Sequence, residues 1–172
     1  MVTLSLFRHA KSAWGNPGLG DFERPLAPRG EKAAPRMGAY MAREGLAPGV
    51  VLCSTAKRAR QTLELAQAEW EPKPEIRYED GLYHAGPGEM LRFLQALPAS
   101  CSHAMIIGHN PGVYSLAATL CGDGEGDALA ALGTKFPTAA LAVIEFEGDW
   151  KGISPGQGYL QRFVLPRELP SR

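Results

Sequence analysis

Two histidines of this 172-residue chain each follow an apolar run, and one of them has an arginine beside it. Residues 4–7 (LSLF) lead into Arg8 and His9, and residues 104–107 (AMII) lead through a glycine into His109. Short apolar runs of this kind predict buried strands. Because neighbouring side chains on a strand point to opposite faces, Arg8 and His9 can serve one site only if the first strand ends by about residue 8. They would then lie at the carboxyl edge of a sheet, where open α/β folds bind ligands.

A third polar segment, residues 54–62 (STAKRARQT), follows the apolar run of residues 50–53 and predicts the start of a helix. The N–H groups at a helix start attract anions, and the planar guanidinium of arginine suits phosphate oxygens. Arg58 would lie in the first turn of this helix. Two histidines and two arginines, with no cluster of carboxylates nearby, indicate phosphate binding rather than a metal site.

The elements that must position these residues alternate between strands and helices. Ser54 and Thr55 are the expected N-caps of the second helix, and Pro35 can move the start of the first helix a few residues later. The alternation predicts an α/β fold, a three-layer α/β/α sandwich with a mostly parallel central sheet. The expected order is strand 4–7, helix 29–44, strand 50–53, helix 56–70, edge strand 75–78, helix 88–97, strand 104–108, helix 112–121, loop 122–135 and strands 139–146 and 159–165.

Length and composition predict one globular domain over residues 1–172. Lysines plus arginines and aspartates plus glutamates are both 18, so the formal net charge is zero and no basic surplus indicates nucleic acid. The three cysteines have no CxxC spacing, which favours small buried residues over a disulfide framework or a zinc site. No apolar stretch approaches the length that spans a membrane. We therefore expect a cytoplasmic protein that is not associated with membranes, and a monomer.

Three motifs together resemble the histidine phosphatase superfamily, in its phosphoglycerate-mutase-like branch. They are residues 6–12 (LFRHAKS), 54–62 (STAKRARQT) and 108–112 (GHNPG). Within that branch the chain resembles the SixA-type phosphohistidine phosphatase family. Residues 24–30 (RPLAPRG), 135–138 (KFPT) and 163–167 (FVLPR) are also similar to that family, so the resemblance covers nearly the whole chain.

The resemblance implies a role for each of four residues. His9 would be the nucleophile, neutral when it attacks, and would form a phosphohistidine intermediate that water hydrolyses. Arg8, Arg58 and His109 would bind the phosphoryl oxygens and stabilise their charge in the transition state. His109 would do so as an imidazolium, which a bound phosphate favours. The resemblance implies no cofactor and no metal.

Three further polar residues lie close to these in the sequence. Lys11 and Ser12 lie just beyond the nucleophile in the sequence. Each either contacts the phosphate or is an ordinary loop residue, and a lysine on a loop is commonly solvated. Arg60 lies two residues from Arg58 and therefore on a different side of the helix. We expect Arg60 to be a surface residue or a contact to the wider substrate.

One position departs from the pattern of the larger phosphatases and mutases of this branch. In those proteins a glutamate after the third strand protonates the leaving group, whereas here His84 stands at the corresponding place in the sequence. His84 is either the proton donor or a loop residue with no such role. Glu79, Asp80 and Glu89 are nearby substitutes that the sequence does not place.

The stretch between Arg58 and Asp80 has room for only one helix and an edge strand, so we expect a compact fold without a lid insertion. A shallow, open pocket suits a phosphorylated side chain on a protein better than an enclosed sugar phosphate. We therefore predict a phosphatase that acts on phosphohistidine in a protein such as a phosphotransfer domain. The alternatives are a phosphatase for small phosphate esters with the same His9 chemistry, and a protein that binds phosphate but turns over poorly.

Overall fold

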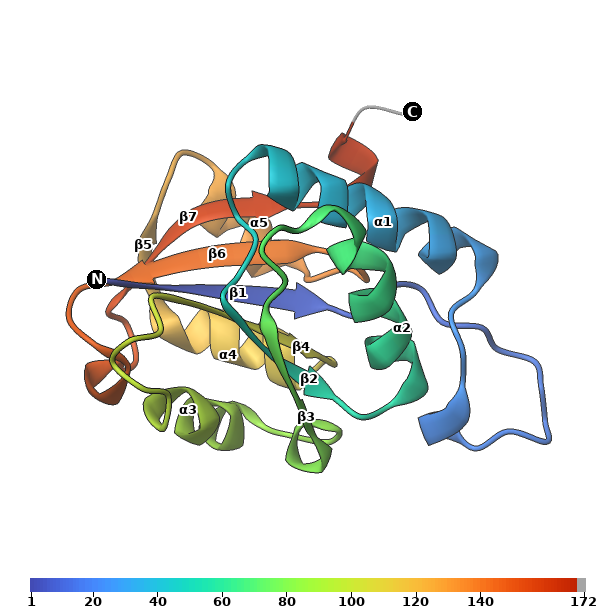
Figure 1. The fold of residues 1–172 in the computed structure, drawn as a ribbon. Coiled ribbons are helices and arrows are strands. Elements are labelled where there is room, and N and C mark those ends of the chain that lie inside the picture. The colour runs from blue at the N-terminus through green and yellow to red at the C-terminus, as the bar shows by residue number, and fades with distance from the viewer. Residues whose placement is uncertain (170–172) are drawn as a thin grey trace.

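The protein is built on one seven-stranded sheet, seen in a computed structural model that describes residues 1–169 (Figure 1). The strands are β1 (Val2–Arg8), β2 (Val50–Ser54), β3 (Glu75–Glu79), β4 (His103–Gly108), β5 (Cys121–Gly124), β6 (Leu141–Phe146) and β7 (Gly158–Val164). The α-helices are α1 (Pro28–Arg43), α2 (Lys57–Ala66), α3 (Pro87–Gln95), α4 (Gly112–Leu120) and α5 (Ala128–Thr134). Short 3-10 helices are η1 (Asp21–Glu23), η2 (Gln67–Glu69), η3 (Asp80–Leu82), η4 (Trp150–Gly152) and η5 (Pro166–Glu168). No helix in this range is long and apolar enough to cross a bilayer.

The strands follow the spatial order β3-β2-β4-β1-β6-β7-β5. Every neighbouring pair is parallel except β1–β6 and β6–β7, so β6 alone runs against the others. The central strands β2, β4 and β1 are adjacent and parallel. Arg8 of β1 lies opposite Gly108 of β4, and Cys53 of β2 lies opposite Ile107. The three strands therefore end together at one edge of the sheet.

Two apolar cores separate the sheet from its two helical layers. Alternate residues of β1 enter different cores: Leu4 and Leu6 pack toward α3, α4 and α5, while Phe7 packs toward α1 and α2. Figure 1 shows α1 and α2 on one side of the sheet and α3 and α4 on the other. This arrangement confirms the predicted α/β/α sandwich with a mostly parallel sheet. Between Arg58 and Asp80 the chain contains only the rest of α2, η2 and β3, so the fold is compact there, as expected.

The expected loop at residues 122–135 is wrong, because this stretch contains most of β5 and all of α5. β5 has the sequence CGDG, which carries no alternation of apolar and polar residues. It is a strand because its backbone pairs with β7. Its Gly122 lies so close to another segment that an added Cβ would be 2.0 Å from the carbonyl oxygen of Gly156. α5 has only seven residues, too few for a clear helical period. Pro35, in contrast, lies inside α1 without delaying its start.

The packing of α1 on α2 depends on a close backbone approach at Gly38. A Cβ added there would lie 1.8 Å from the carbonyl oxygen of Ala66. The carbonyl of Gly38 also accepts a hydrogen bond of 3.0 Å from the indole N–H of the buried Trp70. Any larger residue must therefore push the two helices apart.

We expect Gly38→Ala to lower the free energy of unfolding by about 3 kcal/mol, since the clash is with backbone that cannot rotate away. The matched control is Gly133→Ala in α5, where an added Cβ meets no atom within 4 Å. That change should be neutral or stabilising by up to about 1 kcal/mol, because alanine favours helix. Denaturant unfolding of the three proteins measures both effects. Equal stability of the two variants would contradict the assigned role of Gly38.

Candidate active site

The end of β1 places His9 at the carboxyl edge of the sheet. β1 ends at Arg8, as expected, but the backbone N–H of His9 still donates to the carbonyl of Gly108 at 3.1 Å. The N–H of Ala139 donates to the carbonyls of both Arg8 and His9, each at 3.1 Å, which fixes the chain at this point. The side chain of His9 is only 6% exposed.

The ring of His9 has a defined orientation. Its Nδ1 lies 2.8 Å from the carbonyl oxygen of Ala10, and because a carbonyl can only accept, Nδ1 carries the hydrogen. The lone pair is then on Nε2. Burial, together with the nearby His109, Arg58 and Arg8, lowers the pKa of His9 to about 3. His9 is therefore a neutral imidazole at neutral pH, with one nitrogen able to act as a nucleophile.

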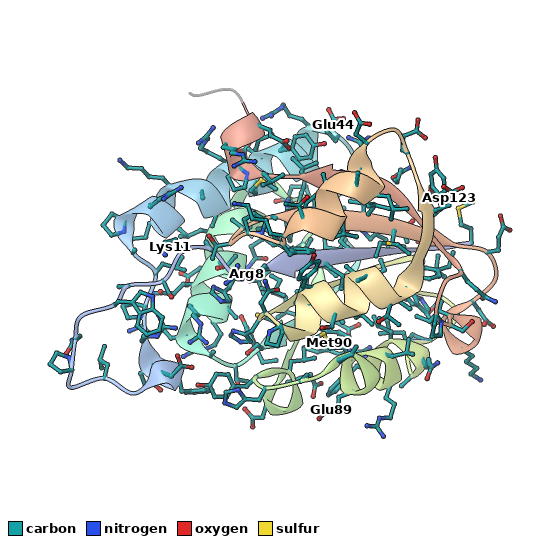
Figure 2. The ribbon with its side chains drawn as sticks, turned by 180° about the vertical axis from the view of Figure 1, so that it is seen from behind. Arg8, Lys11, Glu44, Glu89, Met90 and Asp123 are labelled. Carbon is teal, nitrogen blue, oxygen red and sulfur yellow. The ribbon has the colours of Figure 1, made fainter. Side chains whose placement is uncertain are left out.

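Arg8 is held by the segment that precedes β6. Its Nη1 donates to the carbonyl of Phe136 at 3.0 Å, and Nδ2 of Asn110 donates to the same oxygen at 3.0 Å. The Nε of Arg8 is buried without a hydrogen-bond partner among the described residues. Desolvation and the charge of Arg58 lower the pKa of Arg8. Figure 2 shows Arg8 at the end of β1.

The first turn of α2 carries Arg58, which is only 6% exposed. Thr62, one turn further, connects this helix to the segment of His9: its Oγ1 accepts the N–H of Ala10 at 2.9 Å and donates to the carbonyl of Arg58 at 2.7 Å. The motif that contains Arg58 thus also fixes the segment that contains His9. Arg60 is exposed and donates to the carbonyl of Thr55 at 2.8 Å.

His109 completes the group, with its ring centroid 5.0 Å from that of His9. Its Nε2 lies 2.7 Å from Oγ of Ser54, which also accepts the N–H of Ala56 at 3.3 Å. Ser54 is therefore not the cap of α2 that its position suggests; the N-cap is Ala56, with no side-chain hydrogen bond. When the hydroxyl of Ser54 donates to Nε2, the hydrogen of a neutral imidazole is on Nδ1.

The protonation state of His109 decides how it can bind an anion. Burial, followed by the charge of Arg58, lowers the pKa of His109 to about 4, so without a bound phosphate the ring is neutral at neutral pH. The imidazolium expected beside a bound phosphate stays a prediction. Its Nδ1 is buried and has no partner among the described residues. A neutral His109 with its hydrogen on Nδ1 can still donate one hydrogen bond to a phosphoryl oxygen.

Asp21 and Tyr83 belong to the same cluster, although no motif in the sequence indicates a role for them. Asp21 Oδ2 accepts from Nη2 of Arg58 at 3.1 Å and from the hydroxyl of Tyr83, while Oδ1 accepts from Arg24 at 3.0 Å. The carbonyl of Asp21 accepts from Nη1 of Arg58 at 2.8 Å. The sequence offers one signal for the ion pair between Asp21 and Arg24, namely their spacing of three residues, and none for the contact between Asp21 and Tyr83.

The hydrogen bonds to Asp21 set the protonation of both residues. The bond from Tyr83, then the contacts with Arg24 and Arg58, hold the pKa of Asp21 far below its usual value. Asp21 is therefore an anion at neutral pH and cannot supply a proton. Burial and the bond to Asp21 raise the pKa of Tyr83, which keeps its hydroxyl protonated.

A pocket of about 360 Å³ opens over this cluster. Its ionisable lining residues are Asp21, Arg58, Tyr83, His84 and His109. His84 is exposed, and its ring lies 3.9 Å from the ring of Tyr83. The structure thus brings His84 into the pocket with Arg58 and His109. A larger cavity of about 670 Å³ lies next to it under residues 13–25, and Asp21 lines both.

The three carboxylates that could replace the family acid do not line this pocket. Asp80 accepts a hydrogen bond of 2.7 Å from Thr55. Glu89 lies on α3 (Figure 2) and accepts from the N–H of Gly86 at 3.3 Å. It lines another cavity. Glu79 is the last residue of β3.

Lys11 and Ser12 also lie outside the pocket. Ser12 is buried and its Oγ accepts a hydrogen bond of 2.6 Å from Arg24. Lys11 is exposed and lines a separate pocket next to α1. His9 and Arg8 do not line the pocket either, so a contact of Lys11 or Ser12 with phosphate stays a prediction.

The chemistry available at the site is that of oxyanion binding beside a nucleophile. The half-buried Arg8, the buried Arg58 and His109 surround a neutral imidazole. Among the described residues, Nε of Arg8, Nε of Arg58 and Nδ1 of His109 are buried atoms with no hydrogen-bond partner. Such donors suit the equatorial oxygens of a phosphoryl group. Over residues 1–169 no group of three or more His, Cys, Asp or Glu side chains could hold a metal ion.

The chain was compared with known protein families, sequences and structures. Residues 4–92 match the family model described as the histidine phosphatase superfamily (branch 1). An uncharacterized protein of Mycobacterium tuberculosis is 38% identical over 162 residues, which cover 93% of this chain and 99% of that protein.

Two solved structures are similar over nearly their whole length. The one assigned as phosphohistidine phosphatase SixA of Nakamurella multipartitia has 32% identity and a TM-score of 0.83, covering 96% of each chain. The protein histidine phosphatase SixA in complex with tungstate has 25% identity and a TM-score of 0.80, covering 98% of this chain and 100% of that one. The resemblance found in the three motifs is thereby confirmed: the chain belongs to the histidine phosphatase superfamily and is a phosphatase of the SixA type.

Proposed function

We propose that this phosphatase removes the phosphoryl group from phosphohistidine on another protein, with His9 as the nucleophile. The observation that carries the proposal is the buried, neutral ring of His9, whose Nδ1–H is bound to the carbonyl of Ala10. This leaves Nε2 as the only ring nitrogen with a lone pair. The SixA phosphatases, to which the chain is similar, support phosphohistidine as the substrate class.

The reaction would take place in two displacements at phosphorus. In the first, the lone pair on Nε2 of His9 attacks phosphorus, and the bond between phosphorus and the substrate imidazole breaks, its electron pair passing to the leaving nitrogen. In the second, water attacks the phosphorylated His9, the new P–N bond breaks, and phosphate and a proton are released. Arg8, Arg58 and the Nδ1–H of His109 would bind the phosphoryl oxygens in both steps.

The acids present in the pocket favour an N–P substrate. An alkoxide is a poor leaving group and needs a proton as the P–O bond breaks. Here Asp21 is anionic, and the hydrogen of Tyr83 is directed to it. A phosphohistidine ring that carries a proton on its other nitrogen leaves as neutral imidazole without help.

Quenching the enzyme during turnover of a ³²P-labelled substrate should trap a phosphorylated protein. The label should be acid-labile and alkali-stable, as an N–P bond is, and it should be absent from His9→Ala. Because the pKa of His9 is lowered to about 3, the ring stays neutral as the pH falls and becomes protonated only near pH 3. Trapping should therefore not decline through protonation of His9 between about pH 5 and about pH 8. Label retained by His9→Ala would contradict the assignment.

Replacing Arg58 tests whether its planar group binds the phosphoryl oxygens. Lysine keeps the charge but not the fork, so Arg58→Lys should lose about a hundredfold in kcat/KM with p-nitrophenyl phosphate, nearly as much as Arg58→Ala. Arg60→Ala is the matched control, because Arg60 is exposed and bound to the carbonyl of Thr55. It should keep nearly full activity. Similar losses at both arginines would show that Arg60 also serves the site.

The leaving-group argument is tested by comparing a phosphohistidine protein with an alkyl phosphate ester. The wild type should favour the phosphohistidine protein by about a hundredfold or more in kcat/KM, the size of a missing general acid. His84→Glu should raise ester hydrolysis and change phosphohistidine turnover little, while His84→Gln should not raise it. If His84 delivers the proton in the wild type, it can do so only as an imidazolium, and His84→Gln should then lower ester hydrolysis. Equal wild-type rates on both substrates would refute the argument and direct the test to Glu79, Asp80 and Glu89.

A further inference from the structure

A second pocket beside the end of β1 has a different chemistry from the active site. It measures about 170 Å³, and four of its lining side chains are cationic: Lys11, Arg29, Lys135 and Arg167. They come from four separate segments, namely the connector after β1, the first turn of α1, the residue after α5, and η5. No acidic side chain among the described residues lines this pocket, which we call the basic pocket.

The four charges of the basic pocket are not neutralised by the rest of the described chain. Within residues 1–169 no ion pair or hydrogen bond involves any of the four side-chain cations. Glu31 follows Arg29 by two positions, so it projects from a different side of α1. Glu168 accepts a hydrogen bond of 3.0 Å from the backbone N–H of Leu165.

The basic pocket and the active site are held by the same two backbone segments. Lys11 is two residues from His9, and its carbonyl accepts the N–H of Ala27 at 2.9 Å. α1 packs so closely there that a Cβ on Gly30 would lie 2.2 Å from that carbonyl oxygen. Lys135 precedes Phe136, whose carbonyl binds Arg8. Figure 2 shows Lys11 and Arg8 near each other at the end of β1. The cations therefore lie at a fixed place beside the phosphate site.

We propose that the basic pocket binds carboxylates of an acidic segment that flanks the phosphorylated residue of the substrate protein. This inference rests on the proposed function above and names a feature of its substrate. All four cations are exposed side chains. Long, solvated side chains suit the several carboxylates of an acidic protein segment. A single small anion would instead be held by the buried donors of the active site.

We expect the basic pocket to increase the rate at which an acidic substrate protein associates and to favour such proteins over neutral ones. Because the formal net charge of the chain is zero, no overall field attracts an acidic partner, and a local cluster of cations must do so. Exposed charge pairs contribute little one at a time, so the four together should change kcat/KM by about tenfold at low salt. The effect should decline as salt screens it.

The test uses two phosphohistidine peptides that differ only in their flanks, glutamates in one and glutamines in the other. The wild type should hydrolyse the acidic peptide about tenfold more efficiently, through KM, and the preference should fall with added salt. The double variant Arg29→Glu, Lys135→Glu should lose the preference or reverse it. Its turnover of the neutral peptide should be unchanged.

The matched control is the double variant Arg43→Glu, Lys151→Glu, which changes the net charge equally. Both control residues are exposed; α1 ends at Arg43, and η4, with Lys151, follows β6, so both lie at the opposite edge of the sheet. This variant should keep the preference for the acidic peptide. A loss equal to that of the first variant would mean a general charge effect and would overturn the proposal.

Binding to His9→Ala, measured by fluorescence anisotropy, separates this proposal from the proposed function. If the wild type hydrolyses neither peptide but His9→Ala binds the acidic one more tightly, the basic pocket stands and the phosphohistidine substrate does not. If both peptides are hydrolysed and bound equally well, the phosphohistidine substrate stands and the basic pocket does not bind an acidic segment.

Discussion

The burial of one uncharged imidazole among cations is the constraint on which this structure depends. In the mechanism we propose, His9 must be neutral to attack phosphorus, yet it lies beside Arg8 and Arg58, the proposed phosphate ligands. Desolvation and these positive charges act in the same direction, and both disfavour the protonated ring. The fold supplies the burial because three adjacent parallel strands end together, and Thr62 connects the segment after β1 to the helix of Arg58.

The same burial would leave guanidinium groups without partners in the absence of phosphate. A buried cation without a hydrogen-bond partner is costly, so each arginine has one from within the chain. Arg8 uses the carbonyl of Phe136, and Arg58 uses the carbonyl and carboxylate of Asp21. Asp21 lies on the connector between β1 and α1, with its side chain 46% exposed. Within residues 1–169, Nε of both arginines and Nδ1 of His109 have no hydrogen-bond partner and are available to a ligand.

The sequence predicts the residues that lie at strand ends, since strand ends are set by local apolar runs. The carboxyl edge gathers whatever follows β1, β2 and β4, so Arg8, His9, Arg58 and His109 can be grouped from the sequence alone. Asp21 and Tyr83 cannot be added to this group from the sequence, because their hydrogen bond joins a connector to a loop 62 residues away. Neither segment shows the periodic pattern of apolar residues that predicts a helix or a strand. Ser54 resembles a helix cap by its position, because the sequence does not show that His109 competes for its hydroxyl.

The groups that sequence reasoning misses decide which chemistry the site can perform unaided. The carboxylate of Asp21, which accepts hydrogen bonds from three side chains, is too stable as an anion to release a proton. The bond from Tyr83 also holds the hydrogen of that hydroxyl. Proton delivery is thus left to the exposed His84 or to the substrate itself. Between Arg58 and Asp80 the chain contains only the rest of α2, η2 and β3, so this stretch has no lid that could enclose an acid. Discrimination among substrates must then come from the leaving group and from surfaces outside the phosphate site.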